Sequence, residues 1–164
     1  MTTRGYTIIE MLIYGLVMTV LMSALIVSVF SLRTLYERTF VLRAMTTTGQ
    51  NVIDRVVREI RAADIVNIGG SSFGVDYGTL SLLSTATTTM FTSSTSSINI
   101  NVNGISGGEF IPSGMTVNAF HLYRYVNTDT EMVRVELILS TANTFASTTK
   151  TFYGGAVLRG AYTN

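Results

Sequence analysis

The feature that most constrains this chain is a long uncharged stretch close to its start. After Glu10 no charged residue occurs until Arg33, so residues 11–32 form a mostly apolar run. A helix of that length, at about 1.5 Å per residue, covers the ~30 Å hydrocarbon core of a bilayer. The alternative, a buried helix of a soluble domain, rarely stays apolar on every face for so many turns. The run therefore predicts a membrane-spanning helix.

The residues around this run differ from those of a secretory signal peptide. A signal peptide carries a small-residue cleavage site after its apolar region, whereas residues 31–34 lead directly into more helix-like sequence. The small residue, Gly5, comes before the run instead. Glu10 lies at the start of the run, where an isolated carboxylate would cost several kcal/mol in hydrocarbon. Two options follow for Glu10: it reaches the membrane interface, or it has a partner in another chain.

Residues 4–13, with the sequence RGYTIIEMLI, resemble the processing and assembly motif of type IV prepilins and type II secretion pseudopilins. In that family a short basic leader ends in glycine, and a membrane peptidase cuts after it on the cytoplasmic side. The resemblance implies cleavage between Gly5 and Tyr6 and N-methylation of Tyr6. It also implies that Glu10 pairs with the N-terminal amine of a neighbouring subunit as a filament grows.

The resemblance implies partners and a location as well. The partners would be other pilin or pseudopilin subunits, the prepilin peptidase/methylase and a membrane protein of the assembly platform. The chain would cross the cytoplasmic (inner) membrane once, with its C-terminal head outside the cytoplasm, and then enter a pilus or pseudopilus. A count of Arg33, Arg38 and Arg43 against Arg4 favours the opposite orientation. We follow the resemblance, because long downstream domains translocate despite their charge.

Beyond the apolar run the helix should continue as an amphipathic one. Asp54 with Arg58 and Arg55 with Glu59 are oppositely charged pairs one turn apart on its exposed side. The helix should extend from about residue 8 to residue 65, with Gly15 as the one soft point in its membrane half. Residues at three- and four-residue steps form one apolar stripe: Leu42, Met45, Gly49, Val52, Val56, Ile60 and Ala63.

After the glycine-rich residues 67–72 the hydrophobic period changes from 3.6 to 2, which is typical of strands. On one strand Val133, Val135, Leu137 and Leu139 should face the core, with Arg134 and Glu136 opposite. On another, Asn99, Asn101 and Asn103 should form a polar outer face. The expected strands cover residues 77–84, 88–92, 97–103, 119–126, 132–140 and 148–158, with a hairpin loop at 127–131.

The expected fold is therefore α+β and pilin-like, with a long N-terminal helix packed on a C-terminal antiparallel β-sheet. Residues 1–5 would be the prepilin leader peptide and residues 6–33 the transmembrane and assembly half of the helix. Residues 34–66 would be the amphipathic half, and residues 67–164 the β-sheet head.

Residues suited to catalysis or metal binding are few. The chain has no cysteine and His121 is its one histidine, so it offers neither a Cys–His nucleophile pair nor a multi-histidine metal site. The sequence therefore predicts no enzyme and no cofactor. Asn127, Asp129 and Glu131 alternate around a turn and could offer oxygens to Ca²⁺, although a solvated hairpin tip is the simpler interpretation. Many pilins close a C-terminal loop with a disulfide, so the absence of cysteine favours a minor subunit over a major one.

Nucleic-acid binding is disfavoured by charge. From residue 65 onward four basic residues face five acidic ones, a net charge of −1, with no basic cluster for phosphates. Tyr123 and Tyr125 beside Arg124 could stack on bases, but aromatic residues on a strand more often serve packing. The alternative to a filament subunit is an uncleaved, single-pass membrane-anchored binding or sensor domain. Among filaments, a surface pilus, a secretion pseudopilus and a DNA-uptake fibre remain open.

Overall fold

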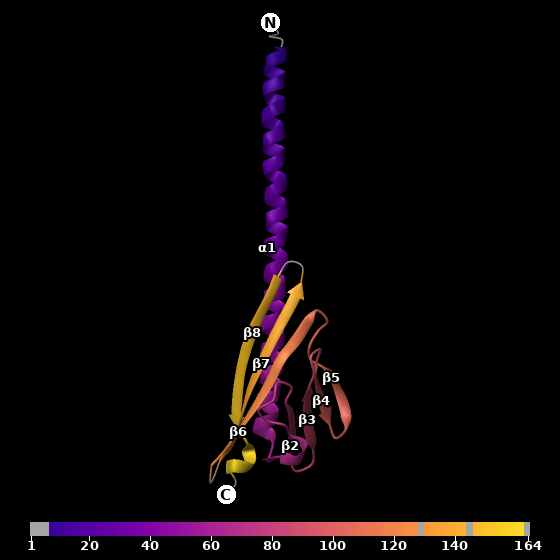
Figure 1. Cartoon of the computed structure of the whole chain (residues 1–164), viewed down its shortest axis with the longest axis vertical. Helices are drawn as coiled ribbons and strands as arrows, with labels where there is room; N and C mark the ends of the chain where they lie inside the picture. The colour runs from indigo at the N-terminus through magenta and orange to yellow at the C-terminus, as the bar shows by residue number, and fades with distance from the viewer. Residues whose placement is uncertain (1–6, 128–129, 144–145, 163–164) are drawn as a thin grey trace. The chain divides into compact units, whose positions relative to one another are not determined.

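The computed structural model describes residues 7–127, 130–143 and 146–162. The chain divides into two compact units, Met1–Phe40 and Val41–Asn164, which are described separately. One long helix, α1 (Ile8–Ala62), contributes to both (Figure 1). The first unit consists of the N-terminal part of this helix, and the second contains its remainder together with every strand.

The helical part of the first unit presents its apolar side chains to the surroundings on all sides. Several of its hydroxyl groups bond within the helix: Thr19 Oγ1 and Ser23 Oγ each donate to the carbonyl oxygen three residues earlier, at 2.8 Å. Ser28 Oγ donates to the Ala24 carbonyl oxygen at 3.0 Å. Such internal bonds satisfy these three hydroxyl groups in a lipid environment. By length and composition α1 can cross a membrane, and it is the one helix among the described residues that can.

In the second unit α1 buries the stripe that the sequence predicts. Met45, Gly49, Val52, Val56 and Ile60 are buried. Ala63, just past the helix end, is buried as well, and Ile53 joins the stripe although its spacing did not mark it. Leu42, at the N-terminal end of the stripe, stays exposed.

The helix ends at Ala62, three residues earlier than expected. The N–H of Asp64 donates to the carbonyl oxygen of Leu83 at 2.9 Å, and Ile65 pairs with Leu83 in a strand ladder. Residues 63–65 therefore turn from the helix directly into a sheet.

The strands form two antiparallel sheets, so the expected single sheet is wrong. The first sheet has five strands in chain order and the second has three (Figure 1). Between them lie Pro112, which lacks an N–H, and Gly114, which has a φ of 91°; this segment interrupts the ladder. The first sheet contains β1 (Ile65–Val66), β2 (Thr79–Leu83), β3 (Thr88–Ser93), β4 (Ile98–Val102) and β5 (Ile105–Glu109), and the second contains β6 (Met115–Val126), β7 (Glu131–Asn143) and β8 (Ala146–Val157).

The α+β class, a helix packed on antiparallel sheets, is confirmed. The alternation on β7 holds, since Val133, Val135, Leu137 and Leu139 are fully buried. They join α1 and residues of both sheets in one hydrophobic core. Two short 3₁₀ turns, Ile68–Gly70 and Arg159–Tyr162, complete the described elements.

Residues 72–78, which connect the 3₁₀ turn to β2, tie the two sheets together. The N–H of Gly74 donates to the Leu122 carbonyl oxygen at 3.1 Å, and the N–H of Gly78 donates to the Phe120 carbonyl oxygen at 3.0 Å. Tyr77 and Phe120 form a parallel bridge. We call residues 72–78 the strap, because they run along β6 and lead into β2.

Candidate assembly site

Of the three residues that the motif marks, one lies within the described part of the chain. Gly5 and Tyr6 lie outside the described residues, whereas Glu10 occupies the first turn of α1. The N–H groups of Glu10 and Met11 both donate to the carbonyl oxygen of Thr7, at 3.1 and 3.2 Å. The helix therefore begins directly before Glu10, and the partial positive charge at a helix N-terminus favours a carboxylate there.

The Glu10 side chain is partly exposed. No ion pair of Glu10 occurs within residues 7–127, 130–143 and 146–162. A carboxylate at the start of an apolar helix is costly in lipid until it meets a cation or a hydrogen-bond donor. Glu10 is thus suited to bind a positively charged group supplied from outside the described residues.

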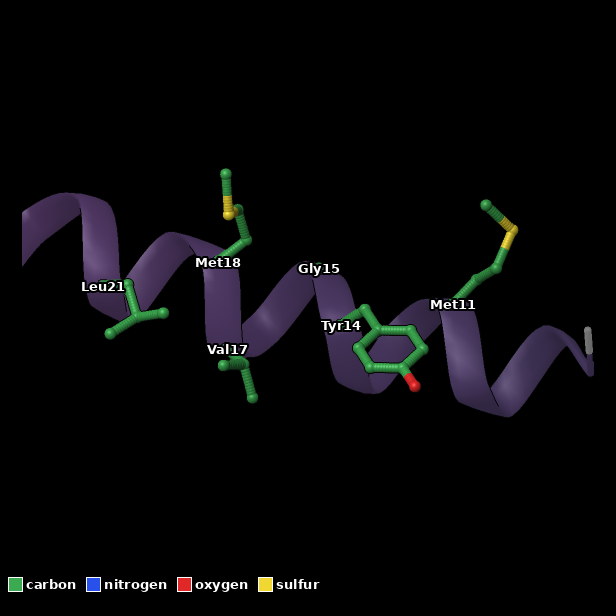
Figure 2. A pocket seen from close by; sticks show the side chains of 6 residues that line it. All are labelled: Met11, Tyr14, Gly15, Val17, Met18 and Leu21. Carbon is green, nitrogen blue, oxygen red and sulfur yellow. The ribbon is translucent and has the colours of Figure 1, made fainter.

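A shallow apolar hollow lies on α1 directly beyond Glu10 (Figure 2). Met11 and Met18 point to the same side of the helix with Gly15 between them, as Figure 2 shows. A Cβ placed on Gly15 would meet nothing within 4 Å. The residues that line the hollow are Met11, Tyr14, Gly15, Val17, Met18 and Leu21.

This hollow is suited to a second apolar helix. A glycine lets another helix approach closely, and methionine side chains adapt to the surface that they meet. Glu10 and the hollow follow one another along the same few turns of α1, so one neighbouring helix can engage both. The sequence marked Gly15 as a soft point; the hollow gives it a second role, which the flanking methionines at three- and four-residue spacing could have indicated.

The calcium candidates from the sequence are only partly brought together. Asp129 lies outside the described residues. The carboxylate Oε1 of Glu131 accepts a hydrogen bond from Arg124 Nε at 2.5 Å, which closes the β6–β7 hairpin. Within the described residues no group of three His, Asp or Glu side chains is arranged to hold a metal ion.

His121 has a partner that sequence spacing could not reveal. Its Nε2 lies 2.9 Å from Oδ1 of Asp76, which belongs to the strap, 45 residues earlier in the chain. Its Nδ1 is buried without a hydrogen bond and lies 3.9 Å from Oε2 of Glu136. His121 therefore links the strap to β6.

The expected grouping of Tyr123 and Tyr125 with Arg124 is altered by the strand register. Tyr123 pairs with Arg134 and Tyr125 with Met132, whereas Arg124 pairs with the buried Val133 and points to the opposite face. The two tyrosines therefore share their face with Arg134 and not with Arg124.

Comparisons of the chain with known protein families, with curated proteins and with solved structures found no match.

Proposed function

We propose that this chain is a minor pilin or pseudopilin, a structural subunit of a type IV pilus or a type II secretion-like filament. The observation that carries the proposal is the order of features along the chain. The prepilin-like residues 4–13 come first, an apolar helix with an exposed surface follows, and the helix then continues into a head of antiparallel sheets.

In this proposal a prepilin peptidase cuts between Gly5 and Tyr6, and the new amine of Tyr6 is methylated. The amine of an incoming subunit then pairs with Glu10 of a subunit already in place. Such a pair neutralises a carboxylate that would otherwise be costly in lipid. The hollow at Gly15 would receive side chains from the neighbouring helix, which extends the contact beyond the ion pair.

The chain would act by assembly and not by catalysis. It would span the cytoplasmic membrane once, its head outside the cytoplasm, before the assembly platform draws it into the filament. The hydroxyl groups of Thr19, Ser23 and Ser28 bond within the helix, and the apolar surface of this part of the helix is exposed on all sides. The same helix can therefore lie in lipid first and among other helices later.

The mature N-terminus tests the proposal. We would express the full chain in cells with and without a prepilin peptidase and measure the intact mass and N-terminal sequence of the membrane-extracted protein. The expected product with the peptidase begins at N-methylated Tyr6, and without it the leader remains. A chain that keeps Met1 or Thr2 in both cells would instead support the uncleaved, membrane-anchored binding or sensor domain.

A further inference from the structure

The solvent face of the β6–β8 sheet carries residues that the core does not use. The register places Tyr123 opposite Arg134, Tyr125 opposite Met132, and Glu136 opposite Tyr153. Side chains directly opposite one another in a ladder lie on the same face. The other face carries the buried residues Leu122, Val135 and Leu137. We call the solvent-side set the tyrosine face: Tyr123, Tyr125, Met132, Arg134 and Tyr153.

The tyrosine face is open to solvent. The exposed fractions are 53% for Tyr125, 59% for Tyr153 and 37% for Met132. Large side chains on a sheet surface contribute little to folding while they stay this exposed, since the stabilisation scales with the apolar area removed from water. Tyrosine also combines an apolar ring with a hydroxyl group that forms hydrogen bonds, and such residues are enriched at binding surfaces.

Arg134 lies among these rings, and its guanidinium N–H groups can donate hydrogen bonds to a ligand. Its Cζ lies 5.4 Å from the centroid of the Tyr153 ring, within the range of a cation–π contact. Within the described residues Arg134 has no carboxylate partner. A guanidinium group presents a rigid fork of N–H donors, which can bind two neighbouring oxygen atoms of a ligand.

The groups beside the tyrosine face limit the charge of a ligand. In the β6–β7 ladder, the pair of His121 and Glu136 lies beside the pair of Tyr123 and Arg134 on the same face. Asp76 contacts His121 there. One arginine thus faces two carboxylates, so the surroundings do not favour a polyanion, and nucleic acid in particular requires several cationic contacts. The alternation of rings with donors and acceptors is equally unsuited to a purely apolar ligand.

We propose that the tyrosine face binds a neutral polysaccharide. The apolar C–H face of a sugar ring would stack on the exposed rings of Tyr125 and Tyr153, because the electron-rich face of an aromatic ring attracts such C–H groups. Sugar hydroxyl groups would accept hydrogen bonds from Arg134 and donate to Glu136 and Asp76. Side chains two residues apart on a strand are about 7 Å apart. Tyr123 and Tyr125 therefore follow one another along β6 and can contact successive sugar units of one polysaccharide chain.

This inference goes beyond the proposed function and does not depend on it, because the tyrosine face lies entirely within the second unit. We would test the full-length chain in a detergent without a sugar headgroup, by affinity electrophoresis in gels containing dextran, amylose, galactomannan or hydroxyethylcellulose. Polygalacturonate serves as the anionic counterpart. The expected result is retardation by at least one neutral polymer and none by polygalacturonate.

Three variants of the tyrosine face sharpen the test. Tyr125→Ala and Tyr153→Ala should each weaken the retardation roughly tenfold, since each removes one stacking ring. Tyr153→Phe should keep most of it, because the ring remains. Tyr36→Ala is the matched control: Tyr36 is 73% exposed on α1, outside the tyrosine face, and its loss should change nothing.

Each other outcome overturns the proposal. Absence of retardation by all four neutral polymers would do so, as would retardation by polygalacturonate alone. Retardation that Tyr125→Ala and Tyr153→Ala leave unchanged would place binding elsewhere on the chain. The circular dichroism spectrum of each variant must match that of the wild type, which we expect because both side chains are exposed.

Discussion

Gly49 of α1 packs against the ring of Phe152 in β8 so closely that a Cβ at position 49 would lie 2.4 Å from the ring atom Cε2. On the sheet side, a Cβ on Gly154 would lie 2.5 Å from Cγ2 of Ile53. Each partner therefore contributes one glycine to the helix–sheet contact of the second unit. A glycine within a helix normally costs up to about 1 kcal/mol relative to alanine, and the close packing of Phe152 accounts for its use here.

A side chain at position 49 should therefore destabilise the second unit. Gly49→Val adds bulk to a filled site, and we expect a loss of about 2 kcal/mol in the free energy of unfolding. Thermal or urea denaturation of the full chain in detergent, followed by circular dichroism, measures the loss. Gly49→Val combined with Phe152→Leu should recover part of it, because the smaller side chain makes room.

Gly69→Ala is the control for that experiment. A Cβ there would meet just one atom within 4 Å, Oδ1 of Asn67 at 3.7 Å, so the variant should unfold as the wild type does. If Gly49→Val proved as stable as Gly69→Ala, the close contact with Phe152 would not hold in solution.

The second unit should fold without the membrane helix. Among the residues that the structure describes, all the buried hydrophobic side chains lie at or beyond Met45, and every strand follows the end of α1. A truncated chain that starts at Thr34 should be soluble and monomeric, with a circular dichroism spectrum of mixed helix and strand and one cooperative unfolding transition. Aggregation, or the spectrum of an unfolded chain, would show that the second unit needs the first unit in order to fold.

The sequence predicts best where one face of an element is buried. On β7 the alternation of Val133, Val135 and Leu137 with Arg134 and Glu136 follows from the burial of a single face, and the apolar stripe of α1 follows for the same reason. Glu10 and the apolar run could likewise be placed on one helix, because spacing within a helix is local information.

Strand β5 could not be predicted, because its sequence ISGGE has two glycines and every residue in it is exposed. It forms because Asn103 and Gly104, with φ of 52° and 80°, make a two-residue turn that folds the chain back on β4. Asn103 therefore belongs to the turn and not to the polar strand face, and its Oδ1 accepts a hydrogen bond from the N–H of Thr88 at 2.8 Å. The alternating pattern identified the three asparagines, but it could not show that Asn103 would belong to a turn.

Contacts between segments that are far apart in the chain could not be predicted from the sequence either. No spacing rule links His121 to Asp76, and the face of Arg124 depends on where the β6–β7 ladder begins. A shift of one residue in strand register would exchange Arg124 and Tyr123 between the two faces. Long-range pairing, rather than local pattern, decides these positions.

The strap should stay attached when its contact between Asp76 and His121 is weakened. The Asp76 side chain is 76% exposed, and exposed pairs contribute little to stability. The backbone bonds of Gly74 and Gly78 to β6 remain in the variant Asp76→Asn. We expect an unchanged melting temperature but faster hydrogen exchange at the amides of residues 72–78, measured by mass spectrometry. A drop of many degrees in the melting temperature would mean that the contact between Asp76 and His121 holds the two sheets together.

Processing should depend on Gly5. In the proposed function the peptidase approaches the backbone at a residue without a side chain, so Gly5→Leu should leave the leader attached. The intact mass of the extracted protein reports the result directly. Thr3→Leu is the matched control, because it places the same leucine side chain in the leader away from the cleaved bond and should still be processed. Maturation of Gly5→Leu to the wild-type mass would refute the assignment of the site.

Glu10 should matter for assembly and hardly at all for folding or insertion, because it lies at the start of α1, far along the chain from the buried core. Glu10→Gln keeps the size and polarity of the side chain and removes its charge. Removing one partner of an ion pair in a low-dielectric site typically costs about 3–5 kcal/mol, since the remaining charge is left unpaired. The variant should be inserted and cleaved normally, yet enter filaments at least tenfold less than wild-type subunits that are expressed beside it.

Asp54→Asn is the matched control: it removes an exposed carboxylate from the same helix in the second unit and should be incorporated as the wild type is. Cross-linking of sheared filaments and quantification of the tagged subunit measure both. Equal incorporation of Glu10→Gln and wild type would leave Glu10 as an interfacial residue without a charge partner, and the amine–carboxylate pairing would have to be abandoned for this chain.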